Sequence, residues 1–171
     1  MAVNAYLYID GITGPSTSKT GFIDILSFSW GVSQTSTYGT GASGKESKAG
    51  RADFSNLSIM KVLDAASPLI CECCASGTII ANVYILYDKP IGTGATTQQD
   101  YFRLYLTDAL VTAVQLSGSS ENPTESVSFA FQTVEIAYKA EVDNGASLAG
   151  AVPKGWDLAA LNGAWAAPAF K

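Results

Sequence analysis

The chain has 171 residues, a formal net charge of −5, and only 15% charged side chains against 47% hydrophobic ones. This length suits one domain that buries a sizeable core. The ten basic residues are scattered singly, and no apolar run approaches the roughly 18 residues that cross a bilayer, so we expect neither nucleic acid binding nor membrane insertion. No basic and then hydrophobic leader opens the chain, which favours synthesis in the cytoplasm and export without a signal peptide.

Short runs of aromatic and β-branched residues, separated by Gly, Ser, Asn and Pro, are typical of strands and dominate the sequence. In one of them Phe28, Trp30 and Val32 alternate with small residues, as in a half-buried strand. The expected strands, in chain order, span residues 5–9, 22–32, 54–63, 79–88, 101–107, 110–116 and 126–138.

The last of these runs changes phase along its length. Its apolar side chains alternate in one phase as far as Phe131 and in the opposite phase from Val134 to Tyr138. Without a correction, the slip at Gln132 and Thr133 would turn the second apolar set to the other face. The pattern therefore predicts a bulge or a bend, as in a long strand that wraps around a barrel.

One helix is expected among the strands. Ser67 is suited to the N-cap, Pro68 to the first helical position, and Gly77 to the C-terminal stop. Ile70 and two of the cysteines share one face of this segment at helical spacing. The pattern predicts a mainly β fold, a β-barrel with one short α-helix.

Two segments lack periodicity. Residues 33–50 form a Gly- and Ser-rich stretch, which we expect to be an extended loop of a barrel domain spanning 1–142. Residues 143–171 are rich in Ala and Gly but contain Trp156, Trp165 and Phe170. Aromatic residues in such a segment predict docking, either on the barrel or on an adjacent subunit.

The chain contains no histidine, which removes the commonest general base and the commonest metal ligand. Cys71, Cys73 and Cys74 lack a fourth ligand for zinc, so we expect no metal and no cofactor. Cys73 and Cys74 are interpreted as small buried hydrophobic residues, with reversible oxidation as the alternative. The acidic residues at strand ends are interpreted as solvated turn residues: Asp24, Asp88, Asp100 and Asp108.

A motif at residues 39–46 follows the phosphate-loop pattern G-x-x-x-x-G-K. It then places Glu46 where magnesium binding requires Ser or Thr, and a carboxylate there would repel phosphates. No convincing helix follows. The motif is therefore interpreted as a loop, and the sequence predicts no catalytic apparatus.

Six segments, in the right order along almost the whole chain, are similar to the Hcp (haemolysin-coregulated protein) family of type VI secretion tube proteins. They are YLYIDGITG at 6–14, ILSFSWGVSQ at 25–34, LSIMK at 57–61, DAASPL at 64–69, ESVSFAFQTVE at 125–135 and GWDL at 155–158.

The resemblance implies a two-sheet β-barrel with one helix, assembled into homohexameric rings that stack into a hollow tube. It also implies a contractile sheath, a spike protein and effector cargo as partners, and no enzymatic activity. In this family a loop at the place of 33–50 contacts the next ring, so the expected ring-stacking residues are Tyr38, Lys45, Glu46, Lys48 and Arg51. The alternative is a monomeric ligand-binding β-sandwich, such as a carbohydrate-binding module; a hydrolase that uses carboxylates alone is the least favoured class.

Overall fold

The structure, a computed structural model, describes residues 4–38, 47–92, 97–118, 122–142, 147–163 and 165–170. Its elements follow the order β1(Asn4–Ile9), β2(Ile23–Asp24), β3(Ser27–Ser29), β4(Val32–Tyr38), β5(Ser47–Phe54), β6(Leu57–Val62), α1(Ser67–Ser76), β7(Ile79–Ile91), β8(Thr97–Ser117), β9(Thr124–Ala130), β10(Thr133–Tyr138), β11(Glu141–Val142), β12(Ser147–Leu148) and β13(Val152–Asp157). Within these residues no helix is long and apolar enough to cross a membrane.

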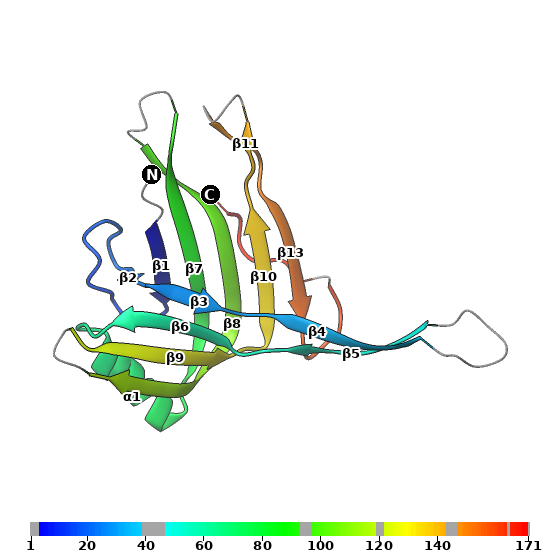
Figure 1. Cartoon of the computed structure of the whole chain (residues 1–171), viewed down its shortest axis with the longest axis horizontal. Coiled ribbons are helices and arrows are strands. Elements are labelled where there is room, and N and C mark those ends of the chain that lie inside the picture. Colours follow the sequence, from blue (N-terminus) through cyan, green and yellow to red (C-terminus); the bar gives the residue numbers. More distant parts are fainter. Residues whose placement is uncertain are drawn as a thin grey trace.

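The strands form two crossing layers joined by the long strand β8 (Figure 1). The first part of β8 pairs with β7 and β10, and its last part pairs with β9. The rear layer contains β2, β1, β7, β8, β10 and β13, and the front layer contains β9, β6 and β3 beside α1. The expected fold class, mainly β with two layers and one helix, is confirmed. The barrel is open, because among the described strands β3 pairs with neither β2 nor β13.

The expected strand 22–32 is wrong in its continuity. β2 pairs with β1 in the rear layer, whereas β3 pairs with β6 in the front layer, so the chain crosses between layers at residues 25–26. Conversely, the two expected strands 101–107 and 110–116 form one strand, β8. Asp108 takes a positive φ of 46° inside it, and the ladder continues past that residue. A local apolar pattern does not report which partner each half of a strand finds.

The bend predicted at residues 132–133 is confirmed. β9 pairs with β6 in the front layer, and β10 pairs with β8 and β13 in the rear layer. Phe129 and Val134, on either side of the bend, are both buried. Ile136 and Tyr138, which continue the same alternation, are 37% and 47% exposed because they lie at the open side of the barrel.

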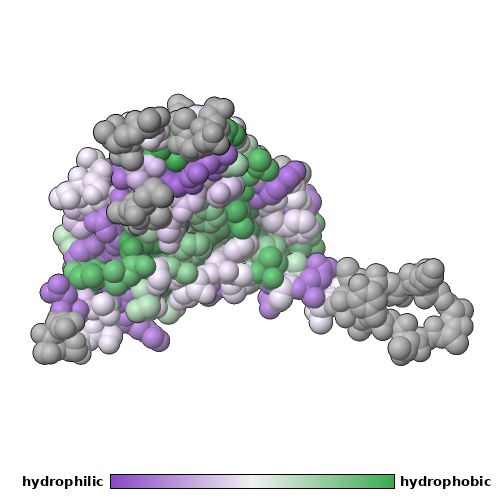
Figure 2. Space-filling view, turned by 45° about the horizontal axis from the view of Figure 1, so that its top comes forward, coloured by the Kyte–Doolittle hydropathy of each residue, from purple (hydrophilic) through white to green (hydrophobic). Residues whose placement is uncertain are grey.

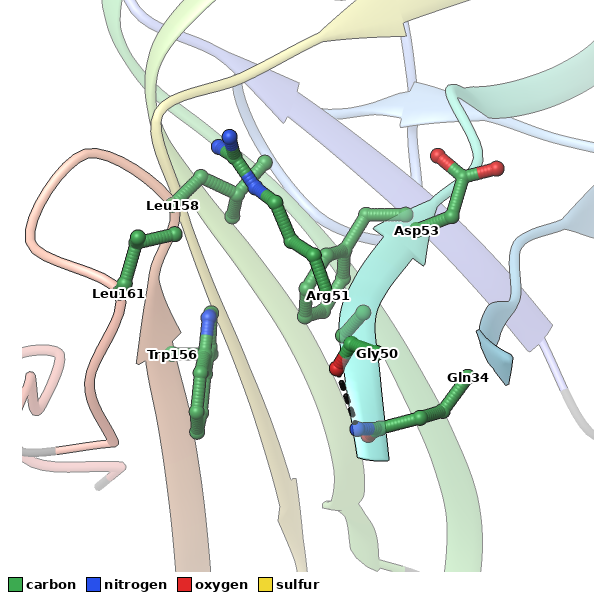
Figure 3. A pocket seen from close by; sticks show the side chains of 9 residues that line it. Gln34, Gly50, Arg51, Asp53, Trp156, Leu158 and Leu161 are labelled. Carbon is green, nitrogen blue, oxygen red and sulfur yellow. Dashed lines mark hydrogen bonds between the residues drawn. The ribbon is translucent and has the colours of Figure 1, made fainter. Parts of the chain in front are cut away.

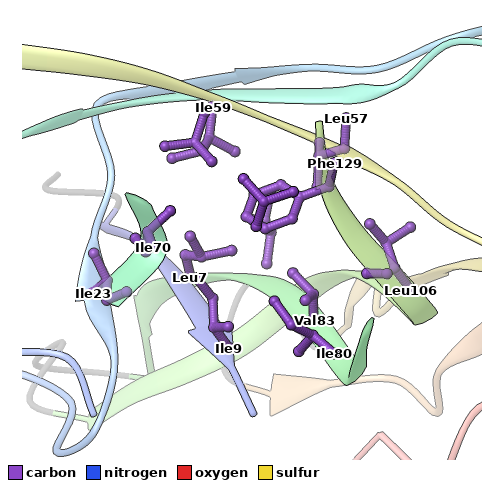
Figure 4. Close-up of a cluster of buried hydrophobic side chains, with 14 of the residues drawn as sticks. Leu7, Ile9, Ile23, Leu57, Ile59, Ile70, Ile80, Val83, Leu106 and Phe129 are labelled. Carbon is purple, nitrogen blue, oxygen red and sulfur yellow. The ribbon is translucent and has the colours of Figure 1, made fainter. Parts of the chain in front are cut away.

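The core lies where the two layers cross, beneath α1 (Figure 4). Leu7, Ile59 and Phe129 are almost completely buried there, and Ile70 of α1 contributes no exposed surface. Burying one such side chain stabilises the folded state by about 1.5–3 kcal/mol. The helix therefore closes one end of the apolar interior.

The ends of α1 agree only in part with the expectation. Gly77 ends the helix with a φ of 66°, as predicted. The N-cap is Ala66 rather than Ser67, because the Ser67 hydroxyl is engaged by buried charged groups. Cys73 and Cys74 pack against the core but are only half-buried, and Cys71 is also half-buried, so the cysteines are less enclosed than expected.

The described parts of the segment 33–50, residues 33–38 and 47–50, are not an unpaired loop, contrary to expectation. β4 and β5 pair along it as an antiparallel ribbon, from Val32 opposite Phe54 to Tyr38 opposite Ser47. Backbone pairing requires no apolar face, and Thr, Val and Tyr favour extended structure even in a polar stretch. At the other end of the chain, β13 joins the rear sheet by pairing with β10. The division at residue 142 stays a prediction.

Candidate assembly surface

The β4–β5 ribbon projects away from both layers (Figure 1). Tyr38 lies in it opposite Ser47, and Lys48 lies opposite Thr37, so the structure places their backbones in the projecting part. Arg51 is nearer the body and exposed. Lys45 and Glu46, the other two expected ring-stacking residues, lie outside the described residues. The ribbon is thus an arm that can reach another molecule.

A hollow of about 650 Å³ lies at the base of this arm (Figure 3). Arg51 and Asp53 stand on its β5 side, and Trp156 faces them from β13. Gln34 donates a hydrogen bond from Nε2 to the Gly50 carbonyl oxygen at 2.8 Å, which ties the two strands of the arm together. The hollow therefore combines an aromatic wall with charged groups.

A second hollow, of about 310 Å³, has a mainly apolar lining and shares Trp156 and Phe54 with the first. The Phe54 and Trp156 rings stack with centroids 6.3 Å apart, and the centroids of Trp30 and Phe54 are also 6.3 Å apart. Val32 and Ile136, which also line this hollow, are 52% and 37% exposed. Figure 2 shows apolar residues gathered across the hollowed face between the layers. Uncovered apolar surface of this kind is typical of contacts between chains.

A buried ion pair stands in the front layer, beneath the N-terminus of α1. Lys61 Nζ lies 2.6 Å from Glu125 Oε1, and neither side chain is exposed. Ser67 Oγ accepts a hydrogen bond from Lys61 and donates one to Glu125 Oε1, at 3.0 and 2.7 Å. Asp64 Oδ1 is 2.8 Å from the same ammonium. The pair fixes β6, β9 and the first turn of α1 relative to one another.

Four acidic residues were interpreted as solvated turn residues. Asp24 and Asp108 are exposed, although both lie within strands, whereas Asp88 and Asp100 are more constrained than expected. Asp88 is only 5% exposed and accepts a hydrogen bond from the Asn4 amide at 3.1 Å. Asp100 pairs with Lys19. Asp88 ends the expected strand 79–88 and Asp100 immediately precedes the expected strand 101–107, but β7 and β8 continue past these ends, so both residues lie inside the sheet. Burial, and then the charge of Asp88, raise the pKa of Tyr6.

Three tyrosines form a cross-strand row in the rear layer. Tyr8 stacks on Tyr84 with centroids 4.6 Å apart, and Tyr84 stacks on Tyr105 at 5.2 Å. They lie opposite one another in register on β1, β7 and β8. Burial raises the pKa of Tyr84 and of Tyr105 above the usual 10.0. No group of His, Cys, Asp or Glu within the described ranges is arranged to hold a metal ion.

Comparison with known proteins decides the family. Residues 6–138 match the family described as "Type VI secretion system effector, Hcp". The chain belongs to the Hcp family. The resemblance drawn from the sequence is thereby confirmed, and the chain is a tube protein of type VI secretion, in a family that is structural and secreted.

Solved structures agree with this assignment. One titled "Structure of a type six secretion system protein" is 25% identical, with a TM-score of 0.81 over 94% of this chain and 99% of that chain. Hcp1 from Salmonella typhimurium is 28% identical, with a TM-score of 0.72 over 95% and 99%. Hcp2 from the same organism is 25% identical, with a TM-score of 0.64 over 93% and 98%. A search of curated proteins found no match.

Sequence analysis did not anticipate the hollow formed by Arg51 and Trp156, because the two residues are distant in the chain. It also missed the buried charges, although a signal for them was present. Lys61 shares the phase of Leu57 and Ile59, which predicts a core-facing lysine. Glu125 likewise shares the phase of the buried residues of β9.

Proposed function

We propose that this Hcp protein forms homohexameric rings that stack head to tail into a hollow tube, which a contractile sheath ejects behind a spike protein and which carries effector cargo. Family membership supports the tube role. The observation that carries the stacking arrangement is the β4–β5 arm, which projects beyond the two layers (Figure 1). An arm on one face that contacts a different face of the next copy makes a heterologous contact, and such contacts generate filaments.

Two surfaces are proposed to contribute to assembly. The segment 33–51 is proposed to contact the next ring through Tyr38, Lys45, Glu46, Lys48 and Arg51. The apolar face around Trp30, Phe54 and Trp156 is proposed to be covered by a neighbouring copy. Burying this surface between chains would stabilise assembly by about 25 cal/mol for each Å² of apolar area removed from water.

Export follows from the same proposal. A tube that is propelled as a whole needs no signal peptide, so the chain is made in the cytoplasm and leaves the cell with its cargo. Its role is structural.

The test replaces residues 38–48 by a short Gly-Ser linker and compares the variant with the wild-type chain under matched conditions. We expect native mass spectrometry to give the same ring mass for both proteins, and electron microscopy to show shorter tubes for the variant. Arg51→Ala, which keeps the length of the arm, should shorten tubes less than the linker does. Tubes of undiminished length from the linker variant would contradict the stacking role, and a monomeric wild-type chain would contradict the ring.

A further inference from the structure

Residues 165–170, called here the C-terminal strap, lie against the rear sheet on the face opposite the core. Arg103 and Tyr105 of β8 point to this face, because they alternate with the core residues Leu104 and Leu106. Glu135 of β10 lies opposite Tyr105 in the ladder and points to the same face. The strap covers these side chains, so they form a surface that another part of the chain already occupies.

Main-chain groups of the strap bind a buried ion pair. Arg103 Nη2 lies 2.7 Å from Glu135 Oε1, with side chains only 7% and 1% exposed. The Ala167 N–H donates to Glu135 Oε2 at 2.7 Å, and Arg103 Nη2 donates to the Pro168 carbonyl oxygen at 2.7 Å. The Glu135 carboxylate thus binds the amide of Ala167, and the Arg103 guanidinium binds the carbonyl of the next residue, Pro168. Such charge-assisted bonds to the backbone orient a bound peptide, while its side chains determine whether it stays bound.

Aromatic side chains hold both ends of the strap. The Trp165 ring lies 6.1 Å from Tyr105 and extends the tyrosine row by one further ring. At the other end the centroid of the Phe170 ring lies 5.0 Å from Arg103 Cζ and 4.2 Å from Lys139 Nζ, within the range of cation–π contacts. These contacts select aromatic residues five positions apart.

Gly155 of β13 provides the space for the first of these rings. A Cβ atom at this position would lie 2.4 Å from the Trp165 carbonyl oxygen and 2.9 Å from Trp165 Cε3. Any residue with a side chain would therefore push the strap off the sheet. Gly150 lies two residues after the end of β12. No atom lies within 4 Å of a Cβ placed there, so it serves as a matched position.

We propose that this face of β8, β10 and β13 is a peptide-binding site, whose resident ligand is the chain's own strap. The site takes a peptide with Trp at its first position and Phe at its sixth. A second chain with such a segment binds only when the strap leaves, so the strap acts as a competing ligand in cis. The site is formed by the strap and the side chains it contacts, and it does not depend on ring stacking.

The test uses the full-length chain with Trp165→Ala and Phe170→Ala, which frees the site and leaves every strand in place. The probe is a fluorescein-labelled peptide of sequence Gly-Ala-Trp-Ala-Ala-Pro-Ala-Phe, and the readout is fluorescence anisotropy. We expect the freed variant to bind the peptide about tenfold or more tightly than the wild-type chain, since a tethered ligand competes at high effective concentration. The same peptide with both aromatic residues replaced by Ala should not bind.

Adding Gly155→Ala to the freed variant should abolish peptide binding, whereas adding Gly150→Ala should leave it unchanged. Circular dichroism of all variants checks that the sheet is intact. If the freed variant is misfolded, amide hydrogen exchange of the wild-type chain provides the second measurement: the Ala167 N–H should exchange slowly, and faster in Gly155→Ala than in Gly150→Ala. Equal binding by the freed and wild-type chains, binding that survives Gly155→Ala, or unprotected Ala167 would overturn the proposal.

Discussion

Replacing Lys61 by Met tests whether the buried ion pair holds the front layer to α1. Methionine has a similar length and no charge, so it fills the same space but does not compensate the charge of Glu125. The change removes the ammonium that lies 2.6 Å from Glu125 Oε1 and 2.8 Å from Asp64 Oδ1. Only the Ser67 hydroxyl, at 2.7 Å, then remains to donate to Glu125 Oε1.

The expected cost follows from the burial of the remaining carboxylate. Both partners are fully buried, and Glu125 Oε2 already has no hydrogen-bond partner among the described residues. Removing one member of such a pair lowers the free energy of unfolding by about 3–5 kcal/mol. Urea titration followed by tryptophan fluorescence measures this loss as a lower midpoint, provided that all variants are compared in the same state of assembly.

The double variant Lys61→Met/Glu125→Met is the control. Two apolar side chains leave no uncompensated charge, so the double variant should recover most of the lost stability and lie within about 1–2 kcal/mol of the wild-type chain. A loss below about 1 kcal/mol in the single variant is typical of an exposed pair and would refute the reasoning.

Three further predictions follow from the structure. Gly14→Ala should lower the free energy of unfolding by about 1–3 kcal/mol, because the added Cβ would lie 2.0 Å from the Phe22 carbonyl oxygen. Gly31→Ala is the control: its Cβ would have its nearest atom at 3.9 Å, so the variant should stay within about 0.5 kcal/mol of the wild-type chain in the same urea assay. Burial raises the pKa of Tyr84 and of Tyr105 in the folded chain, so the unfolded chain loses these protons at a lower pH than the folded chain does. Stability should therefore fall as pH rises above about 10, and should fall less when both tyrosines are replaced by Phe. A urea midpoint unchanged between about pH 8 and about pH 11 would contradict this. The wild-type chain should be free of stoichiometric zinc by metal analysis, and replacing all three cysteines of α1 by Ser should leave ring assembly intact by native mass spectrometry; zinc in the wild-type chain or failure of the Ser variant to assemble would contradict this.

Much of the fold could be predicted from the sequence because period-2 alternation reports which residues share a face. The phase slip at residues 132–133 marked the turn from one layer to the other, and Gly77 marked the end of the helix. The crossing at residues 25–26 could not be predicted, because the apolar alternation runs on while the pairing partner changes from β1 to β6. Partner choice depends on long-range contacts that a local pattern does not contain.

The candidate site was less accessible to prediction. The arm was expected as a loop because its polar composition hides the backbone pairing of β4 with β5. Arg103 and Glu135 were missed for a related reason. Their burial comes from residues 165–170, more than 25 positions further along the chain, and nothing in the alternation of β8 or β10 indicates a cover on that face.

Negative-stain electron microscopy of the purified wild-type chain tests the central claim most directly. The proposed function predicts closed rings with sixfold symmetry and a hollow centre, and tubes of stacked rings as the protein concentration rises. Native mass spectrometry of the same sample should give six times the mass of the chain. Uniform solid particles of monomer size at micromolar concentration would contradict the assignment of this chain as a self-assembling tube subunit.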